Sequence, residues 1–332
     1  MEKVSKGLIS VIIPVYNASK CLSRCFESIV RQTCRNLEIV FVNDCSTDNS
    51  EDCIRSFMNR KEVADLKIKC ISHHYNRGVA AARNTGLDNA TGEYIYYLDA
   101  DDYIEDNAIE SLCHEADKTE ADIVGCEWFL SFSKNERRMI QPVVGNGEEL
   151  FTKMARGVAR WNLWLFMVRR SLYEENGVRF MEKINMGEDM MVMMKLSLYA
   201  DKVSILNVPL YHYVQTQSDS LTRNWSDGYK DQISLNVGEV EKHVTHNYGN
   251  RFNRELDFLK LNIKLPLLIS SSTDSYKKWM EWFSEANGSI MYNKDIAFRT
   301  RLLQLFAYKR QYWLLKLYYY IVIKFVYGIL YR

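Results

Sequence analysis

The chain has 332 residues, of which 47% are hydrophobic and 26% are charged, a globular composition long enough for one large domain or two ordinary ones. The formal net charge is +1, which argues against a nucleic-acid binder held by bulk charge. The charge is unevenly distributed, because seven Lys and Arg but no Asp or Glu follow Asp295.

The cysteines point to a reducing compartment. All eight lie in the first half of the chain, without a Cys-x-x-Cys pair or a zinc-type Cys/His spacing. Reduced thiols in the cytosol are the simplest interpretation. The first ten residues, MEKVSKGLIS, lack the apolar stretch of a signal peptide, so we expect a cytoplasmic protein.

The first hundred residues alternate between short β-branched apolar runs and segments with helical spacing. Strands are predicted at 8–15, 37–42, 67–72 and 94–98, and helices at 19–31 and 78–89. This alternation predicts an α/β fold with a mostly parallel sheet and helices on both faces. Ser46 or Thr47 is the predicted N-cap of a further helix after the second strand.

The pattern is mixed farther along the chain. A strand is predicted at 121–129, helices at 147–156 and 190–199, and an extended segment at 209–214. After Ser220 the apolar residues recur at helical spacing with scattered charge.

Three carboxylates, Asp99, Asp101 and Asp102, follow the fourth predicted strand. Two carboxylates about 5 Å apart repel by roughly 3 kcal/mol at an effective dielectric near 20, so something must offset this cost. A helix cap at Asp102, a solvated acidic loop and a divalent cation are all compatible with the cluster. In such sheets ligands bind beyond the carboxyl ends of the strands, here at 15–17, 43–48 and 99–102.

Five motifs in this order resemble the family 2 glycosyltransferases, which have the GT-A nucleotide-sugar fold. The motifs are SVIIPVYN (10–17), VNDCSTDNS (42–50), NRGVAAARNTGLDNATGEYI (76–95), LDADD (98–102) and MGEDM (186–190). The resemblance implies a GT-A catalytic domain at 1–215, with a nucleotide-binding half at 1–103 and an acceptor half at 104–215. A helical C-terminal region with a basic amphipathic tail would follow at 216–332.

The resemblance also implies a site for a nucleotide sugar, typically with a uracil base. The implied binding residues are Pro14, Val15, Tyr16, Asn17, Asp44, Arg83, Asp99, Ala100 and Asp101. Tyr16 would pack on the base, Asp44 would accept a base N–H, and Arg83 would reach the nucleotide or its phosphates. Taken alone, Tyr16 is equally compatible with a core tyrosine and Arg83 with a solvated helix arginine. Asp44 is also compatible with an Asx-turn residue.

The same resemblance assigns a metal and a base. Asp101 would bind Mg²⁺ or Mn²⁺ and bridge it to the diphosphate, with Asp99 and His212 as further candidate ligands. His212 is also compatible with a packed histidine between two tyrosines. Asp189 would be the general base, although alone it is compatible with an acidic first turn of a helix, and Glu188 would position the loop.

The implied reaction is an inverting transfer of one sugar to an acceptor hydroxyl. The processive motif Gln-x-x-Arg-Trp is absent, so polymer extrusion is not expected. We expect a role in surface polysaccharide or glycolipid synthesis, with a saccharide or lipid-linked acceptor. The alternative is a non-catalytic nucleotide-sugar binder or scaffold on the same fold. Where the family often has Asp-Gly-Ser, this chain has Cys45 in place of glycine, which predicts a turn without a positive φ.

The tail at 296–332 is apolar, aromatic and basic. As one helix, it would place five basic residues within an arc of roughly 120°: Arg299, Lys309, Arg310, Lys316 and Lys324. Two of the lysines interrupt every apolar window of about 20 residues, so a spanning helix is not expected. Attachment to the inner face of an anionic membrane, packing on the protein's own core and a homodimer interface all stay open.

Overall fold

The computed structural model describes residues 5–215 and 227–327. The chain divides into two compact units, the first made of 1–151 and 160–240 and the second of 152–159 and 241–332. The division falls within helix α8 (Asp227–Tyr248), later in the chain than the boundary expected after residue 215.

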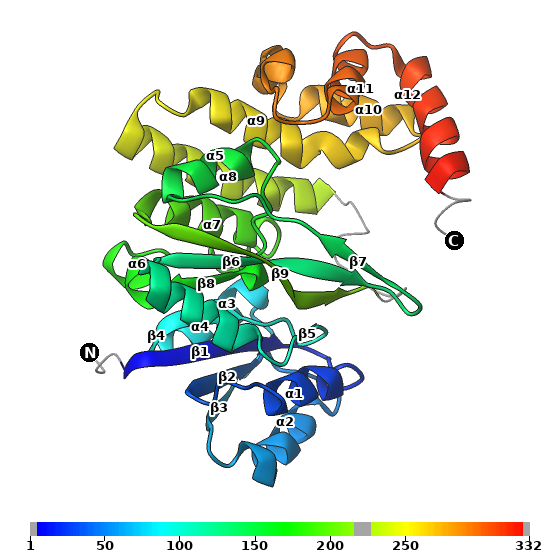
Figure 1. Cartoon of the computed structure of the whole chain (residues 1–332). Helices are drawn as coiled ribbons and strands as arrows, with labels where there is room; N and C mark the ends of the chain where they lie inside the picture. Colours follow the sequence, from blue (N-terminus) through cyan, green and yellow to red (C-terminus); the bar gives the residue numbers. More distant parts are fainter. Residues whose placement is uncertain (1–4, 216–226, 328–332) are drawn as a thin grey trace. The chain divides into compact units, whose positions relative to one another are not determined.

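The first unit is built on one mixed sheet, whose described strands follow the order β3-β2-β1-β4-β8-β6-β9-β5, with β7 paired to β6 (Figure 1). The strands are β1 (Ser5–Val15), β2 (Leu37–Asn43), β3 (Lys67–Ser72), β4 (Gly92–Tyr97), β5 (Tyr103–Ile104), β6 (Ile123–Ser131), β7 (Glu136–Met139), β8 (Phe166–Arg169) and β9 (Val203–Val214). Strands β3, β2, β1 and β4 are parallel, and β8 runs antiparallel between β4 and β6. The predicted mostly parallel α/β sheet is confirmed.

The helices of the first unit follow the strands in the expected alternation. They are α1 (Leu22–Val30), α2 (Ser50–Met58), α3 (Val79–Asp88), α4 (Ala108–Thr119), α5 (Gly147–Ala155), which continues into the second unit, α6 (Arg170–Glu175) and α7 (Glu188–Tyr199), with short 3₁₀ turns at Lys61–Val63 and Leu163–Leu165. Every residue of β2 is buried, and strand side chains alternate between the two faces, so both faces of the sheet are covered.

The core at the β2 side shows why these helices pack where they do. Phe26 of α1 stacks on Phe57 of α2 with ring centroids 4.3 Å apart, and both rings meet Phe41 of β2 edge to face. Such aromatic contacts contribute roughly 1 kcal/mol beyond the area that the rings bury. The amphipathic spacing of α1 therefore directs its apolar side onto the sheet and leaves the loop after β1 at the sheet's carboxyl edge.

The second unit is helical, as predicted for the C-terminal region. After α8 it contains α9 (Asn253–Lys264), a 3₁₀ turn (Leu265–Leu268), α10 (Thr273–Glu281), a second 3₁₀ segment (Ser284–Tyr292), α11 (Phe298–Tyr308), α12 (Tyr312–Tyr318) and a π-helical continuation, η6 (Tyr319–Tyr327). Its own core includes Phe258, Trp279 and Leu315. No helix in 5–215 or 227–327 is long and apolar enough to cross a membrane.

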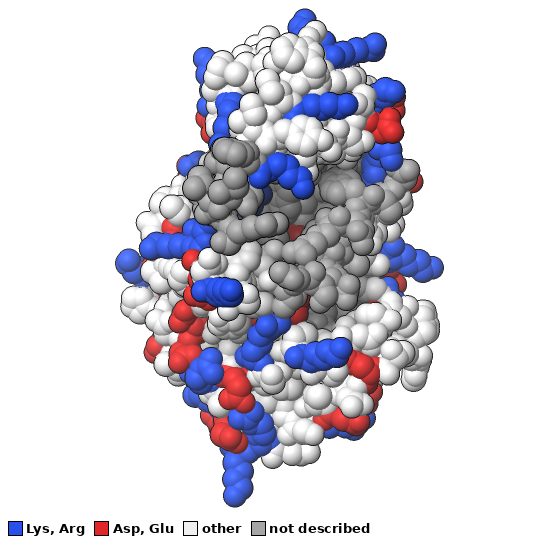
Figure 2. Space-filling view, turned by 90° about the vertical axis from the view of Figure 1, so that its right-hand side faces the viewer, with Lys and Arg blue, Asp and Glu red and all other residues white. Residues whose placement is uncertain are grey.

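The prediction of one amphipathic tail helix is wrong. The chain leaves α11 at Lys309, and Arg310 adopts a left-handed φ of 54° before α12 begins at Tyr312. Arg299 and Lys309 therefore lie on a different element from Lys316, and the five basic residues do not share one arc. On the face shown in Figure 2, Lys and Arg side chains are interspersed with Asp and Glu over much of the surface.

Candidate active site

The loops after β1 and β2 lie against each other at the carboxyl edge of the sheet, as predicted. The Asp44 N–H donates to the Val15 carbonyl at 2.8 Å, and the Asn17 N–H donates to Ser46 Oγ at 3.0 Å. The Thr47 N–H returns a hydrogen bond to Asn17 Oδ1 at 2.7 Å. These bonds use Ser46 and Thr47 to join the two loops, so neither residue is the N-cap predicted above; α2 begins at Ser50, after Asn49.

Tyr16 projects from this edge into solvent. Its side chain is 51% exposed, whereas Val15 is buried and Pro14 is partly buried in the strand end. The alternative of a core tyrosine is therefore wrong. Packing of the Tyr16 ring on a nucleotide base stays a prediction.

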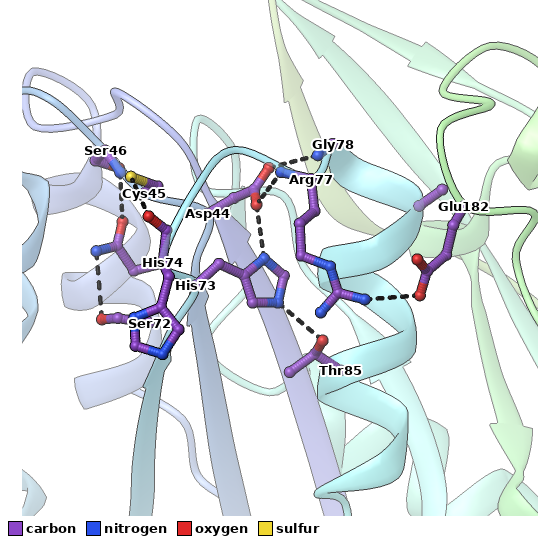
Figure 3. Close-up of polar contacts among 12 residues, drawn as sticks. Asp44, Cys45, Ser46, Ser72, His73, His74, Arg77, Gly78, Thr85 and Glu182 are labelled. Carbon is purple, nitrogen blue, oxygen red and sulfur yellow. Dashed lines mark hydrogen bonds and ion pairs between the residues drawn. The ribbon is translucent and has the colours of Figure 1, made fainter.

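Asp44 is buried and joins the loop after β2 to the start of α3 (Figure 3). Its Oδ1 accepts from His73 Nδ1 at 2.6 Å and from the Arg77 N–H at 2.8 Å, and its Oδ2 accepts from the Gly78 N–H at 2.7 Å. Gly78 has φ 87° and a Cβ there would lie 2.4 Å from the Asn185 side chain, so only glycine fits. Asp44 thus fixes the entry into α3, and its contact with a base stays a prediction.

Two local expectations at this loop change with the structure. Asp44 is not an Asx-turn residue, because its carboxylate bonds backbone N–H groups at the start of α3; its neighbour Asn43 accepts the Ser46 N–H through Oδ1 at 3.1 Å. Cys45 has a φ of 58°, so the prediction that this turn avoids a positive φ is wrong. A non-glycine residue in this conformation costs roughly 1–2 kcal/mol, and the turn holds it nevertheless.

Arg83 of α3 is the centre of the carboxylate cluster. Its Nη1 contacts Asp189 Oδ1 at 2.6 Å and Glu188 Oε1 at 2.7 Å, and its Nη2 contacts Asp99 Oδ1 at 3.4 Å. The residue is only 4% exposed, so a solvated helix arginine is wrong. Burial lowers the pKa of the guanidinium, but Asp189, Asp99 and Glu188 outweigh burial and raise it. A direct contact between Arg83 and a nucleotide stays a prediction.

In the turn after β4, Asp99 is partly buried, whereas Asp101 is exposed. Burial raises the pKa of Asp99 to about 6, with Asp101 and Asp189 adding to the shift and Arg83 opposing it. Asp101 is exposed, and it has no hydrogen bond or ion pair to another residue that the structure describes. Ala100 between them is buried, so Asp99 and Asp101 are held by a short, packed turn.

Asp102 is not the helix cap proposed above. It is fully buried, and α4 begins six residues later, at Ala108. Its carboxylate accepts the Tyr211 hydroxyl at 2.7 Å and the Val214 N–H at 2.8 Å, both from β9. Burial raises its pKa well above the usual range, with Asp101 and Asp99 adding to the shift. The role of Tyr211 was missed because 109 residues separate it from Asp102.

Asp189 is the second residue of α7, after Glu188, and the helix follows Gly187, whose φ is 80°. One oxygen, Oδ1, is held by Arg83, while the one contact of Oδ2 with the described residues is long, 3.4 Å from the Leu163 N–H. Its neighbour Glu188 is buried, and burial followed by the Asp189 charge raises the Glu188 pKa. The structure thus brings Asp99, Arg83 and Asp189 together from three segments of the chain.

His212 is packed against two carboxylates, one just after β5 and one in β7. Its Nε2 contacts Glu105 Oε1 at 2.8 Å, its Nδ1 contacts Glu136 Oε1 at 2.9 Å, and its ring stacks on Tyr103 with centroids 4.1 Å apart. The packed-histidine alternative describes these contacts, and a metal contact by His212 stays a prediction.

A divalent cation fits the turn after β4 by its donor chemistry. Asp101 repels both Asp99 and Asp102, and carboxylate oxygens are the ligands that Mg²⁺ and Mn²⁺ prefer. Within 5–215 and 227–327 no group of three or more His, Cys, Asp or Glu side chains is arranged to hold a metal. A cation here would therefore depend on one or two protein carboxylates and on oxygens from a bound ligand.

Comparison with known proteins identifies the family of this chain. The model of glycosyl transferase family 2 matches residues 10–180, about half of the chain. The chain belongs to glycosyltransferase family 2. The predicted family is thereby confirmed, and the carboxylate cluster lies within or close to the matched region.

Curated glycosyltransferases and a solved structure resemble different portions of the chain. The uncharacterized glycosyltransferase EpsJ of Bacillus subtilis is 33% identical over 65% of this chain and 63% of its own length. Glycosyltransferase GlyA of Streptococcus pneumoniae is 34% identical over 71% of this chain and 36% of its own length. The crystal structure of S. aureus TarS 1–349 in complex with UDP-GlcNAc has a TM-score of 0.70 at 18% identity, covering 94% of this chain and 91% of that one. That likeness confirms the GT-A fold.

Proposed function

We propose that the protein transfers a single sugar from a UDP-sugar to an acceptor hydroxyl, with inversion at the anomeric carbon and with Mg²⁺ or Mn²⁺. The observation that carries the proposal is the shared guanidinium of Arg83, which contacts Asp189 at 2.6 Å and Asp99 at 3.4 Å. Asp99, a candidate donor-binding residue, and Asp189, the candidate base, thus contact the same buried guanidinium group. In the proposed complex, this arrangement would hold an acceptor hydroxyl near the anomeric carbon of a bound donor.

Asp189 is suited to take the proton of the acceptor. Its side chain is 18% exposed, and Oδ2 is the less engaged of its two oxygens. In the proposed step Oδ2 accepts the hydroxyl proton while the acceptor oxygen forms a bond to the anomeric carbon. The bond between that carbon and the phosphate oxygen breaks on the opposite face, and UDP leaves with the bonding electrons. Attack opposite the leaving group gives inversion.

Asp101 is the proposed residue for the cation, with Asp99 beside it. When bound, the cation would neutralise charge on the departing diphosphate. Arg83 holds Asp99 and Asp189 in place during this step, because its contacts fix one oxygen of each carboxylate.

Relatives suggest the classes of donor and acceptor. The crystallised TarS fragment carries UDP-GlcNAc, and TarS of Staphylococcus aureus, a poly(ribitol-phosphate) β-N-acetylglucosaminyltransferase, is 26% identical over 215 residues. A cholesterol galactosyltransferase of Borreliella burgdorferi is 30% identical over 251 residues. We therefore propose a UDP-hexose or UDP-N-acetylhexosamine donor and an acceptor that is a surface polymer or a lipid. The scaffold alternative is less favoured, because Asp101 and Asp189 are both present.

The test is a donor screen on the whole chain. UDP-glucose, UDP-galactose, their N-acetylamino forms and GDP-mannose are compared with Mn²⁺ or Mg²⁺, by thermal shift and by release of free nucleotide. We expect a UDP-sugar to respond and Asp101→Ala to abolish the metal dependence. Asp189→Asn should keep donor binding and lose 10²-fold or more of transfer.

Asp52→Asn is the matched control, because this carboxylate is exposed on α2, away from the cluster, and should leave both readouts unchanged. Full transfer by Asp189→Asn would show that Asp189 is not the base. A donor that binds with metal but is never hydrolysed or transferred would favour the non-catalytic alternative.

A further inference from the structure

The last described helical segment, α12 with its continuation η6, exposes large apolar and aromatic side chains on its outward side. Its exposed side chains recur every three or four residues and form one stripe, here called the Trp313 stripe: Trp313, Lys316, Leu317, Tyr320, Ile321 and Lys324. Residues at this spacing share one side of a helix. Trp313 is 63% exposed and Tyr320 is 57% exposed, so these rings stand largely in solvent.

The opposite side of the same segment packs against the core of the second unit. Leu315 is fully buried in the core of the second unit, and Tyr312 and Tyr318 pack against that core. A helix that packs one side on a core normally presents polar residues on the other. Here four of the six outward residues are apolar or aromatic, which is a contiguous patch and not a scattering of single exposed residues.

The charge of the stripe is of one sign. Lys316 and Lys324 have no acidic partner among the residues that the structure describes, and no Asp or Glu occurs after Asp295. Lys309 and Arg310 add two exposed cations just before α12. The patch is therefore apolar along its length and positive at intervals, with nothing of opposite charge in this part of the sequence.

We propose that the Trp313 stripe binds the surface of an anionic lipid membrane, with the helix lying in the plane of the interface. Trp and Tyr favour the boundary between headgroups and acyl chains, and lysine stems extend along apolar surface while their ammonium groups reach the headgroups. Anionic headgroups supply the charge that the stripe lacks. A self-contact between two copies of the stripe would place lysines against lysines without an acidic partner, which is unfavourable.

The test is vesicle flotation of the whole chain. We expect it to float with vesicles of phosphatidylcholine and phosphatidylglycerol at 7:3, and much less with phosphatidylcholine alone or at high salt. The variant Lys316→Gln/Lys324→Gln should bind roughly 30-fold more weakly, because each lysine near an anionic surface contributes about fivefold. Trp313→Gln/Leu317→Gln should lose at least about tenfold, because the apolar contact is removed.

The control is Lys277→Gln/Lys294→Gln, which removes the same charge from exposed positions of the second unit outside the stripe. It should stay within about threefold of the unaltered protein. Equal binding to neutral and anionic vesicles, or unaltered binding by both stripe variants, would overturn the proposal. The proposal would also be overturned if the unaltered chain bound no vesicles and light scattering showed it to be a dimer that Trp313→Gln/Leu317→Gln converts to a monomer. Circular dichroism confirms that each variant is folded, and transfer to a water-soluble acceptor should be unaffected, which separates this result from the proposed catalysis.

Discussion

Asp99 is a carboxylate whose charged form the fold disfavours. Its folded-state pKa of about 6 lies above the ordinary value near 3.9, mainly because of burial. The folded state therefore binds this proton more tightly than the unfolded state does. It follows that ionised Asp99 lowers the free energy of unfolding above pH 6, and that this loss diminishes as the pH falls towards 4.

Asp99→Asn should accordingly stabilise the protein at pH 7.5, by about 1–3 kcal/mol, since two pKa units correspond to roughly 3 kcal/mol at most. The gain should shrink at pH 5, where the carboxyl is already protonated. Urea unfolding at both pH values measures it, and metal-dependent donor binding should weaken in the same variant. A destabilised Asp99→Asn at pH 7.5 would show instead that the Arg83 contact outweighs burial.

At the scale of elements, β9 holds the turn that carries the candidate metal ligand. The Tyr211 hydroxyl accepts the Asp99 N–H at 3.3 Å and donates to Asp102 at 2.7 Å, while Val214 supplies a second bond to Asp102. The Tyr211 ring stacks on Trp164 with centroids 4.2 Å apart. The position of Asp101 therefore depends on a strand more than a hundred residues away.

Tyr211→Phe keeps the ring and removes only the hydroxyl. We expect a stability loss of about 1–3 kcal/mol, because the buried Asp102 loses one of its two partners. We also expect a rise of roughly tenfold in the Mn²⁺ concentration needed for half-maximal transfer, as the turn loosens. Tyr94→Phe is the control, since its buried hydroxyl bonds the Ala121 carbonyl away from the turn. If both variants keep the same metal requirement, β9 does not position the turn.

At the scale of the whole molecule, each unit has its own core, and a buried lysine lies in that of the second. Lys264 Nζ donates to the Trp282 carbonyl at 2.7 Å, to the Phe283 carbonyl at 3.1 Å and to Asn287 Oδ1 at 2.6 Å. It also lies 4.3 Å from the centre of the Trp279 ring. Burial lowers its pKa to about 7. One side chain thus joins α9 to the segment after α10.

Lys264→Met should destabilise the second unit by about 2–4 kcal/mol, because it removes the three hydrogen bonds that Lys264 Nζ donates in or beside this core. The residues proposed for nucleotide binding all belong to the first unit, so UDP affinity should be unchanged. Calorimetry with and without UDP measures both quantities, and the exposed Lys277→Met serves as the control. A parallel loss of UDP affinity would show that the two units are not energetically separate.

The sequence predicted best where local pattern decides the structure. The predicted strand 67–72 coincides with β3, because a short segment with two isoleucines between polar loops is a local signal. Cys45, Ser46 and Thr47 were predicted wrongly, since their conformations depend on bonds between two loops that are distant in the sequence. The single tail helix was also wrong, because helical spacing does not show where a turn at Arg310 interrupts it.

By itself, the sequence determined the alternation of strands and helices, the polar loops after the strands and, through its ordered motifs, the family. Only the tertiary structure decided which charges meet: Arg83 with Asp189, 106 residues apart, and Asp102 with Tyr211, 109 residues apart. It also decided that Trp313 faces outward. The physical reason is range, because backbone preference and hydrophobic periodicity act over a few residues, whereas ion pairs, burial and exposure depend on which segments the fold packs together.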